Sequence, residues 1–206
     1  MATRVKICGL TNIKDARHAV ACGADYLGFV LVPSSPRYVS AEGVAAIIAD
    51  LPEGIPKVGV FVNRPLRDIE LILQSTGLTI AQLHGDESVS VVRQLGTERT
   101  WKSCTLMTAG DVEAVVDFPA DVLLVDSAVD GRVGGTGRVG NWPLAAELAA
   151  RRKIFLAGGL NPSNVADAVR SVHPFGVDVS SGVEQSPGSK DPEATKAFID
   201  AVRGVG

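Results

Sequence analysis

Two stretches near the end of the chain share one pattern: Ile154-Phe155-Leu156-Ala157-Gly158-Gly159 and Gly176-Val177-Asp178-Val179-Ser180-Ser181-Gly182. Each begins with an apolar run typical of a buried strand and ends in glycine or serine. Such residues leave backbone N–H groups free and let a ligand approach closely. We expect a helix to start after each stretch, at 161–163 and at 183–184, so that free amides and helix dipoles bind an anion. One Gly-Gly pair alone would be read as a turn, but two similar ends predict a phosphate-ester site, formed by Gly158, Gly159, Ser180 and Ser181.

The rest of the chain repeats the same strand-then-helix unit. The apolar patterns predict earlier strands at 5–8, 26–30, 57–62, 79–83, 100–104 and 122–125. Caps, prolines and helical spacing predict helices that begin near residues 12, 40, 65, 89, 111 and 142, with two more at 165–172 and 193–202. The predicted strands are apolar on both faces, as parallel strands covered by helices should be.

Eight such units leave two architectures, an open doubly wound sheet and a closed (β/α)8 barrel. The pattern contains neither an antiparallel edge strand nor a dinucleotide-binding fingerprint. The sequence therefore favours an α/β fold of the TIM-barrel type, at the short end of its length range. We expect residues 1–206 to form one catalytic barrel domain.

The composition limits the partners of this chain. With 206 residues and 46% hydrophobic content, it can bury one substantial core. A formal net charge of −3 without a basic run argues against nucleic acid. No apolar segment approaches the roughly 20 residues needed to span a bilayer, and we expect no secretion signal. An odd number of cysteines, three, with no metal-like spacing suits a reducing cytoplasm.

In a barrel the reacting groups lie at the carboxyl ends of the strands. The polar residues at those positions are Cys8, Arg37, His84, Asp126, Asp178, Ser180 and Ser181. Because side chains alternate along a strand, Lys6 and Cys8 share one face, and so do Leu124 and Asp126. We expect Cys8 and Asp126 to point inward, toward each other across the barrel mouth.

Cys8 and Asp126 each have an alternative interpretation. Cys8 is either a small buried apolar residue or a reactive thiol, and its strand-end position beside Gly9 favours the second. Asp126 follows four apolar residues, so it is either a cap for the next loop or a working acid, and we favour the acid. Cys22 and Cys104 are interpreted as structural residues.

Three further features complete the predicted barrel mouth. The guanidinium of Arg37, on a loop stiffened by Pro36, suits a carboxylate or phosphate. His84 is more typical of a packing or hydrogen-bonding residue, and the other two histidines fall on or beside helices, so no histidine cluster for a metal is expected. The glycine-rich segment 130–140, directly after Asp126, is predicted to be a mobile lid.

These motifs together resemble the phosphoribosylanthranilate isomerase family of tryptophan biosynthesis. The resemblance runs in order from residue 4 to residue 184, with one motif near the end of most strands. The motifs are Lys6-Ile7-Cys8-Gly9-Leu10-Thr11, Ser35-Pro36-Arg37, Gln82-Leu83-His84-Gly85, Leu124-Val125-Asp126-Ser127, Gly134-Gly135-Thr136-Gly137, Ala157-Gly158-Gly159-Leu160-Asn161-Pro162 and Asp178-Val179-Ser180-Ser181-Gly182-Val183-Glu184. The first and fourth are specific to that family, whereas the glycine- and serine-rich ends occur in other phosphate-binding barrels.

The resemblance implies a cofactor-independent Amadori rearrangement of N-(5′-phosphoribosyl)anthranilate to 1-(2-carboxyphenylamino)-1-deoxyribulose 5-phosphate, the third step of tryptophan synthesis from chorismate. It implies Asp126 as general acid and Cys8 as general base. Arg37 would meet the anthranilate end, and Asp178 would hydrogen-bond the amine or the sugar. The implied partner is a small phosphorylated substrate, without nucleic acid, membrane or metal, for a cytoplasmic monomer or homodimer.

Three other functions are less compatible with the sequence. A sister sugar-phosphate isomerase of histidine biosynthesis would need a carboxylate at the position of Cys8. A metal-dependent phosphopentose epimerase would need histidines at several strand ends, and only His84 qualifies. A non-catalytic sugar-phosphate sensor would keep the pocket but has no use for both Cys8 and Asp126.

Overall fold

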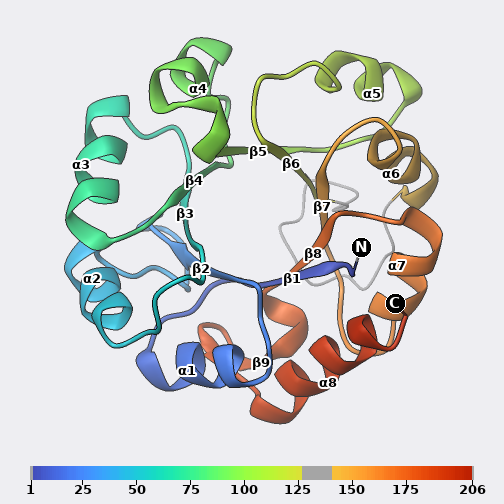
Figure 1. Cartoon of the computed structure of the whole chain (residues 1–206). Helices are drawn as coiled ribbons and strands as arrows, with labels where there is room; N and C mark the ends of the chain where they lie inside the picture. Colours follow the sequence, from blue (N-terminus) through green and yellow to red (C-terminus); the bar gives the residue numbers. More distant parts are fainter. Residues whose placement is uncertain (1, 127–140, 206) are drawn as a thin grey trace.

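The chain folds into a closed barrel of eight parallel strands surrounded by helices (Figure 1). The structure, a computed structural model, describes residues 2–126 and 141–205. The barrel strands are β1 (Arg4–Ile7), β2 (Tyr26–Val30), β3 (Lys57–Phe61), β4 (Ile80–Leu83), β5 (Thr100–Cys104), β6 (Val122–Asp126), β7 (Ile154–Ala157) and β8 (Gly176–Val179). Each strand pairs with the next in parallel, and β8 pairs with β1 to close the ring. The predicted (β/α)8 barrel is confirmed.

Helices connect the strands and cover the outside of the ring. They are α1 (Ile13–Ala21), α2 (Ala41–Ala49), α3 (Leu66–Thr76), α4 (Val89–Leu95), α5 (Ala109–Val115), α6 (Trp142–Ala149), α7 (Val165–Val172) and α8 (Pro192–Arg203). Side-chain caps mark the start of several helices. The side chains of Asn12, Ser40 and Asp191 each accept a hydrogen bond from a backbone N–H in the first turn of their helix. The helices confirm the predicted units, with boundaries that shift by a few residues.

Apolar side chains fill two layers, one on each side of the sheet. The outer layer lies between strands and helices and includes Val5, Ile7 and Phe198. The inner layer fills the barrel with Val58, Trp101, Val122, Leu124, Phe155 and Ala157. Trp101 and Phe155 are stacked with ring centroids 4.5 Å apart, and a Cβ on Gly176 would lie 2.4 Å from the Phe155 ring. Bulky rings therefore fill the amino-terminal half of the barrel and leave the carboxyl end for polar groups.

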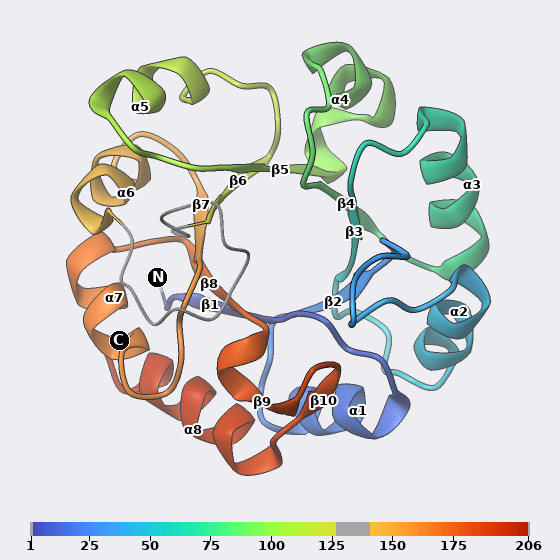
Figure 2. The same cartoon turned by 180° about the vertical axis from the view of Figure 1, so that it is seen from behind.

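The chain after β8 differs from the predicted pattern. A three-residue 3-10 helix (Ser181–Val183) is followed by an antiparallel hairpin of β9 (Glu184–Ser186) and β10 (Ser189–Lys190), which lies beside α1 and α8 (Figure 2). The expected helix start at 183–184 is therefore wrong, and α8 begins only at Pro192. Glu184 takes an extended conformation instead because its carboxylate binds Arg37 and Lys190. The other expected start, 161–163, is a turn, and α7 begins at Val165.

Within the described parts of the chain, no helix combines the length and apolar character needed to cross a membrane. The predicted lid, residues 130–140, lies outside the described residues.

Candidate active site

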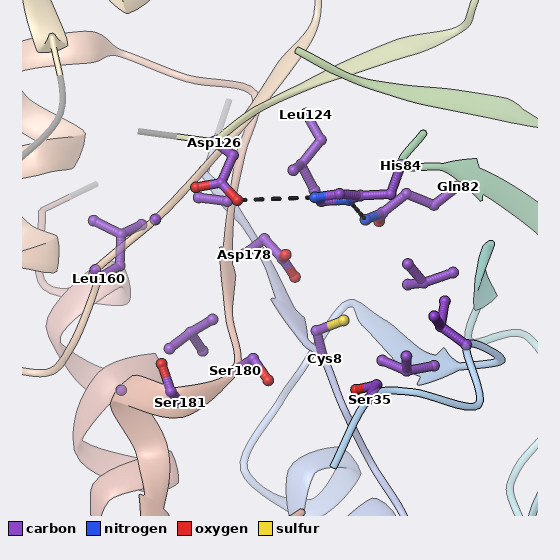
Figure 3. Close-up of a pocket in the computed structure, with 18 of the residues that line it drawn as sticks. Cys8, Ser35, Gln82, His84, Leu124, Asp126, Leu160, Asp178, Ser180 and Ser181 are labelled. Carbon is purple, nitrogen blue, oxygen red and sulfur yellow. Dashed lines mark hydrogen bonds and ion pairs between the residues drawn. The ribbon is translucent and has the colours of Figure 1, made fainter. Parts of the chain in front are cut away.

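A cavity of about 300 Å³ opens at the carboxyl ends of the strands (Figure 3). Its polar lining comes from Cys8, Ser35, Gln82, His84, Asp126, Asp178, Ser180 and Ser181, and its apolar wall includes Val30, Val60, Leu124 and Leu160. Gly158 and Gly159 line the same cavity. The structure thus brings together the predicted acid, the predicted thiol and the predicted phosphate loops. Arg37 is the one predicted residue outside this set of described lining residues.

Cys8 lies immediately after β1 and is 7% exposed. Its amide donates to the Val179 carbonyl at 2.8 Å, which fixes the end of β1 against the end of β8. Burial raises the pKa of the Cys8 thiol, while the neighbouring Lys6 ammonium lowers it and the Asp178 carboxylate raises it. Burial has the largest effect and leaves the pKa of Cys8 raised, and the Lys6 ammonium opposes that shift.

Asp126 is the last residue of β6 and lies across the cavity, beside His84. Its Oδ2 atom is 3.8 Å from His84 Nε2. A dashed line marks this pair in Figure 3. The side-chain amide of Gln82 lies 3.2 Å from His84 Nδ1, and an amide N–H donates, so Nδ1 accepts. The neutral ring then carries its proton on Nε2, directed at Asp126. Burial lowers the pKa of His84 against the attraction of Asp126, which favours this neutral form.

The prediction that His84 is a packing or hydrogen-bonding residue at the barrel mouth agrees with its bond to Gln82, but the sequence indicates no partner for it across the cavity. The one available signal was its place directly after β4, the same kind of position as Cys8. Its pairing with Asp126 joins residues from two different strands and is not visible in the sequence.

The two predicted phosphate loops are packed against each other. A Cβ on Gly182 would lie 1.9 Å from the Leu160 carbonyl oxygen, so the loop after β8 touches the backbone of the loop after β7. Gly158 and Gly159 have φ angles of +86° and +67°, a conformation that glycine adopts without strain. The hydroxyl of Ser180 is buried and finds no hydrogen-bond partner among the described residues. These features suit backbone and hydroxyl recognition of an anionic group.

Arg37 lies beside Gly9 and is held by Glu184. Its Nε and Nη2 atoms donate to the two Glu184 oxygens at 2.8 and 2.6 Å. A Cβ on Gly9 would lie 2.7 Å from Arg37 Cδ and from Ser180 Oγ, so the space beside the cysteine that Gly9 leaves is filled by these two side chains. The hydrogen bonds to Glu184 raise the pKa of Arg37. Its predicted contact with an anthranilate carboxylate stays a prediction.

The other two cysteines lie away from the cavity lining. Cys22 caps α1 and contacts His18, with Sγ and Nε2 3.3 Å apart. Burial raises the pKa of Cys104 to about 11. Among the described residues, no group of three or more His, Cys, Asp or Glu side chains is arranged to hold a metal ion.

The fold and the cavity at the carboxyl ends of its strands define the class of this protein, a (β/α)8-barrel enzyme. The family model for N-(5'phosphoribosyl)anthranilate (PRA) isomerase matches residues 5–201. The chain therefore belongs to the phosphoribosylanthranilate isomerase family.

Individual relatives agree with this placement. An N-(5'-phosphoribosyl)anthranilate isomerase from Pelobacter propionicus is 45% identical over 196 residues, which covers 95% of this chain and 93% of the relative. The crystal structure of phosphoribosyl anthranilate isomerase from Thermotoga maritima is similar with a TM-score of 0.92 at 38% identity, covering 98% of this chain and 99% of that one. A second crystal structure, in complex with reduced 1-(o-carboxyphenylamino)-1-deoxyribulose 5-phosphate, has a TM-score of 0.87 at 38% identity and the same coverage.

Proposed function

We propose that the cavity catalyses the isomerisation of N-(5′-phosphoribosyl)anthranilate to 1-(2-carboxyphenylamino)-1-deoxyribulose 5-phosphate, in tryptophan biosynthesis. The observation that carries the proposal is the placement of Cys8 and Asp126 on one cavity, next to two glycine- and serine-rich loops. The family membership supports the same reaction.

The reaction needs one proton donor and one proton acceptor. Asp126 gives a proton to the ribose ring oxygen as the bond from C1 to that oxygen breaks, and the amine nitrogen forms an iminium ion with C1. The Cys8 thiolate then removes the proton from C2, and the electrons of that bond form an enolamine. The enolamine then tautomerises to the ketone, as C1 gains one proton and the C2 hydroxyl loses one. The Cys8 thiol gives up the proton it took and Asp126 takes one up, which restores both groups, and no heavy atom leaves the substrate.

The remaining residues bind and orient the substrate. Gly158, Gly159, Ser180 and Ser181 hold the phosphate through backbone amides and hydroxyls. Arg37 meets the anthranilate end, and Asp178 accepts a hydrogen bond from the amine or the sugar. Residues 1–206 act as one catalytic domain in the cytoplasm, as a monomer or a homodimer.

Replacement of the two reacting groups tests this assignment. We expect Cys8→Ala and Asp126→Asn each to lower kcat by about 10³-fold, because each change removes one proton-transfer partner. The measurement is the loss of substrate fluorescence without added metal or cofactor, with the phosphate-binding loops left intact.

Each cavity variant has a matched control that changes the same type of residue outside the cavity. Cys22→Ala removes a thiol outside the cavity, and Asp121→Asn removes a carboxylate next to the opposite end of β6 that pairs with Lys153. Both should keep kcat within about twofold, since neither residue touches the cavity. Turnover near the unmodified level in either cavity variant would remove that residue from the mechanism.

A further inference from the structure

A buried lysine in β1 is not used by the mechanism above. The Lys6 side chain is 0% exposed, and its Nζ atom donates to Asp178 Oδ1 at 2.9 Å. Lys6 and Asp178 are register partners in the pairing of β1 with β8. An ammonium in this position is costly to desolvate, and Asp178 compensates it.

The side chains of Lys6 and Cys8 both lie against Gly28 of β2, which has no side chain of its own. A Cβ on Gly28 would lie 2.8 Å from Cys8 Sγ and 3.0 Å from Lys6 Cε. The two side chains therefore leave β1 on the same face and occupy the space that a larger residue at position 28 would fill.

The charges around Cys8 come from several elements. Burial raises the pKa of Cys8 most; Lys6 from β1 and Lys190 from β10 lower it, Asp178 from β8 raises it, and the pKa as a whole stays raised. Arg37, on the loop after β2, also interacts with the ionised sulfur. Burial lowers the pKa of Lys6, but Asp178 and Cys8 outweigh it and leave that pKa raised. Lys6 therefore stays charged at neutral pH.

We propose that Lys6 is a positioning residue for Cys8: its ammonium, anchored by Asp178, stabilises the thiolate that removes the C2 proton. This inference rests on the proposed function of Cys8 as the base. No proton passes through Lys6. The proton moves from substrate C2 to Cys8 Sγ, and the Lys6 ammonium keeps its three protons. With the thiolate formed, the three groups carry a net charge of −1, and protonation of the sulfur returns them to neutrality.

The test is the pH dependence of Cys8 alkylation by iodoacetamide in the full chain, in a Cys22→Ala, Cys104→Ala background. We expect Lys6→Met to move the midpoint of the alkylation profile up by at least about one pH unit, because the nearest positive charge is lost. Asp178→Asn should move it in the opposite direction. Lys57→Met is the matched control, since Lys57 is also buried but bonds the Pro52 carbonyl at the other end of the barrel; its profile should not move.

Turnover gives a second readout. In Lys6→Met, kcat should fall by about tenfold or more with a smaller change in KM, and the limb on which kcat/KM rises with pH should move to higher pH. A purely structural role for Lys6 would change stability without moving either pH profile, and a folded Lys6→Met chain with an unchanged alkylation midpoint overturns the proposal.

Lys6→Met leaves Asp178 as a buried charge, so that variant carries a risk of not folding. In that case the double variant Lys6→Met/Asp178→Asn is compared with the single variant Asp178→Asn. Both lack the Asp178 carboxylate and differ only at Lys6, and the double variant should have the higher alkylation midpoint. Because alkylation needs no substrate, its failure is distinct from failure of the proposed isomerase reaction, which the Cys8 and Asp126 variants test.

Discussion

At the scale of single residues, the site depends on glycines, which leave space for neighbouring side chains, as much as on its polar residues. Gly28 is the clearest case, because Cys8 and Lys6 occupy its side-chain space. A Cβ there would also lie 3.1 Å from the Cys8 Cα atom, so movement of a flexible side chain cannot relieve the crowding alone.

We therefore expect Gly28→Ala to destabilise the fold by about 1–3 kcal/mol and to lower kcat, because β1 must shift away from β2. Chemical denaturation and the turnover assay measure the two effects. Gly110→Ala is the control: Gly110 lies exposed in α5, with its nearest neighbour 3.5 Å from the added carbon. That variant should gain about 0.5–1 kcal/mol, and equal behaviour of the two would contradict the crowding argument.

Most of the candidate site residues could be predicted from the sequence because strand ends are local features. Cys8 follows β1, Asp126 ends β6 and Asp178 lies one residue before the end of β8, and a barrel brings all these strand ends to one mouth. Lys6 was placed on the face of Cys8, but its partner Asp178 is 172 residues away along the chain. A lysine in a strand is usually solvated, so only the closed barrel reveals its burial.

At the scale of elements, the loops after β7 and β8 act as one packed unit. Gly182 lies so close to Leu160 that a side chain at position 182 would collide with the Leu160 carbonyl oxygen. The local pattern after β8 predicts a helix, but two ion pairs of Glu184 favour the hairpin, one with Lys190 inside the hairpin and one with Arg37, 147 residues away along the chain. Secondary-structure propensity depends on residues that are close along the chain, so it does not reveal the ion pair with Arg37.

We expect inorganic phosphate to compete with the substrate at millimolar concentration, because both would use these loops. Gly182→Ala should force the loops apart and raise both the phosphate inhibition constant and KM, with a smaller effect on kcat. The measurement is steady-state inhibition at several phosphate concentrations. Gly204→Ala, whose added carbon has no neighbour nearer than 3.4 Å, is the control, and equal inhibition constants in the two variants would argue against a phosphate site here.

At the scale of the whole molecule, Asp25 ties the two ends of the described chain together. Its carboxylate accepts hydrogen bonds from Arg4, from the Val5 amide and from Arg203 of α8, at 2.7, 2.8 and 2.6 Å. Burial raises the pKa of Asp25, but the hydrogen bonds from Arg203, Arg4 and Val5 outweigh it and leave that pKa lowered.

The sign of this shift fixes its effect on stability. A carboxyl with a lowered folded-state pKa stabilises the fold above its unfolded value of 3.8 and loses that contribution as pH falls through the folded value. We expect Asp25→Asn to lower the free energy of unfolding by about 1–3 kcal/mol at pH 7. The difference from the unmodified chain should shrink below about pH 4.

Chemical denaturation between pH 3 and pH 7 measures this difference. Asp117→Asn, at an exposed turn after α5, supplies a control in which one carboxyl is lost without the three bonds. A pH-independent penalty for Asp25→Asn would show that the charge of Asp25 is not what ties the two ends of the described chain together.

The pairing of β1 with β8 also has a consequence for how the protein is made. The ribosome delivers β1 first and β8 only after every other barrel strand, yet Lys6 and Asp178 meet on that seam, next to Cys8. A nascent or prematurely terminated chain carries the thiol and the lysine without the carboxylate that anchors them and without the Val179 carbonyl that fixes Cys8. We therefore expect isomerase activity only once β8 has docked on β1, so that a chain interrupted before β8 should not turn over substrate.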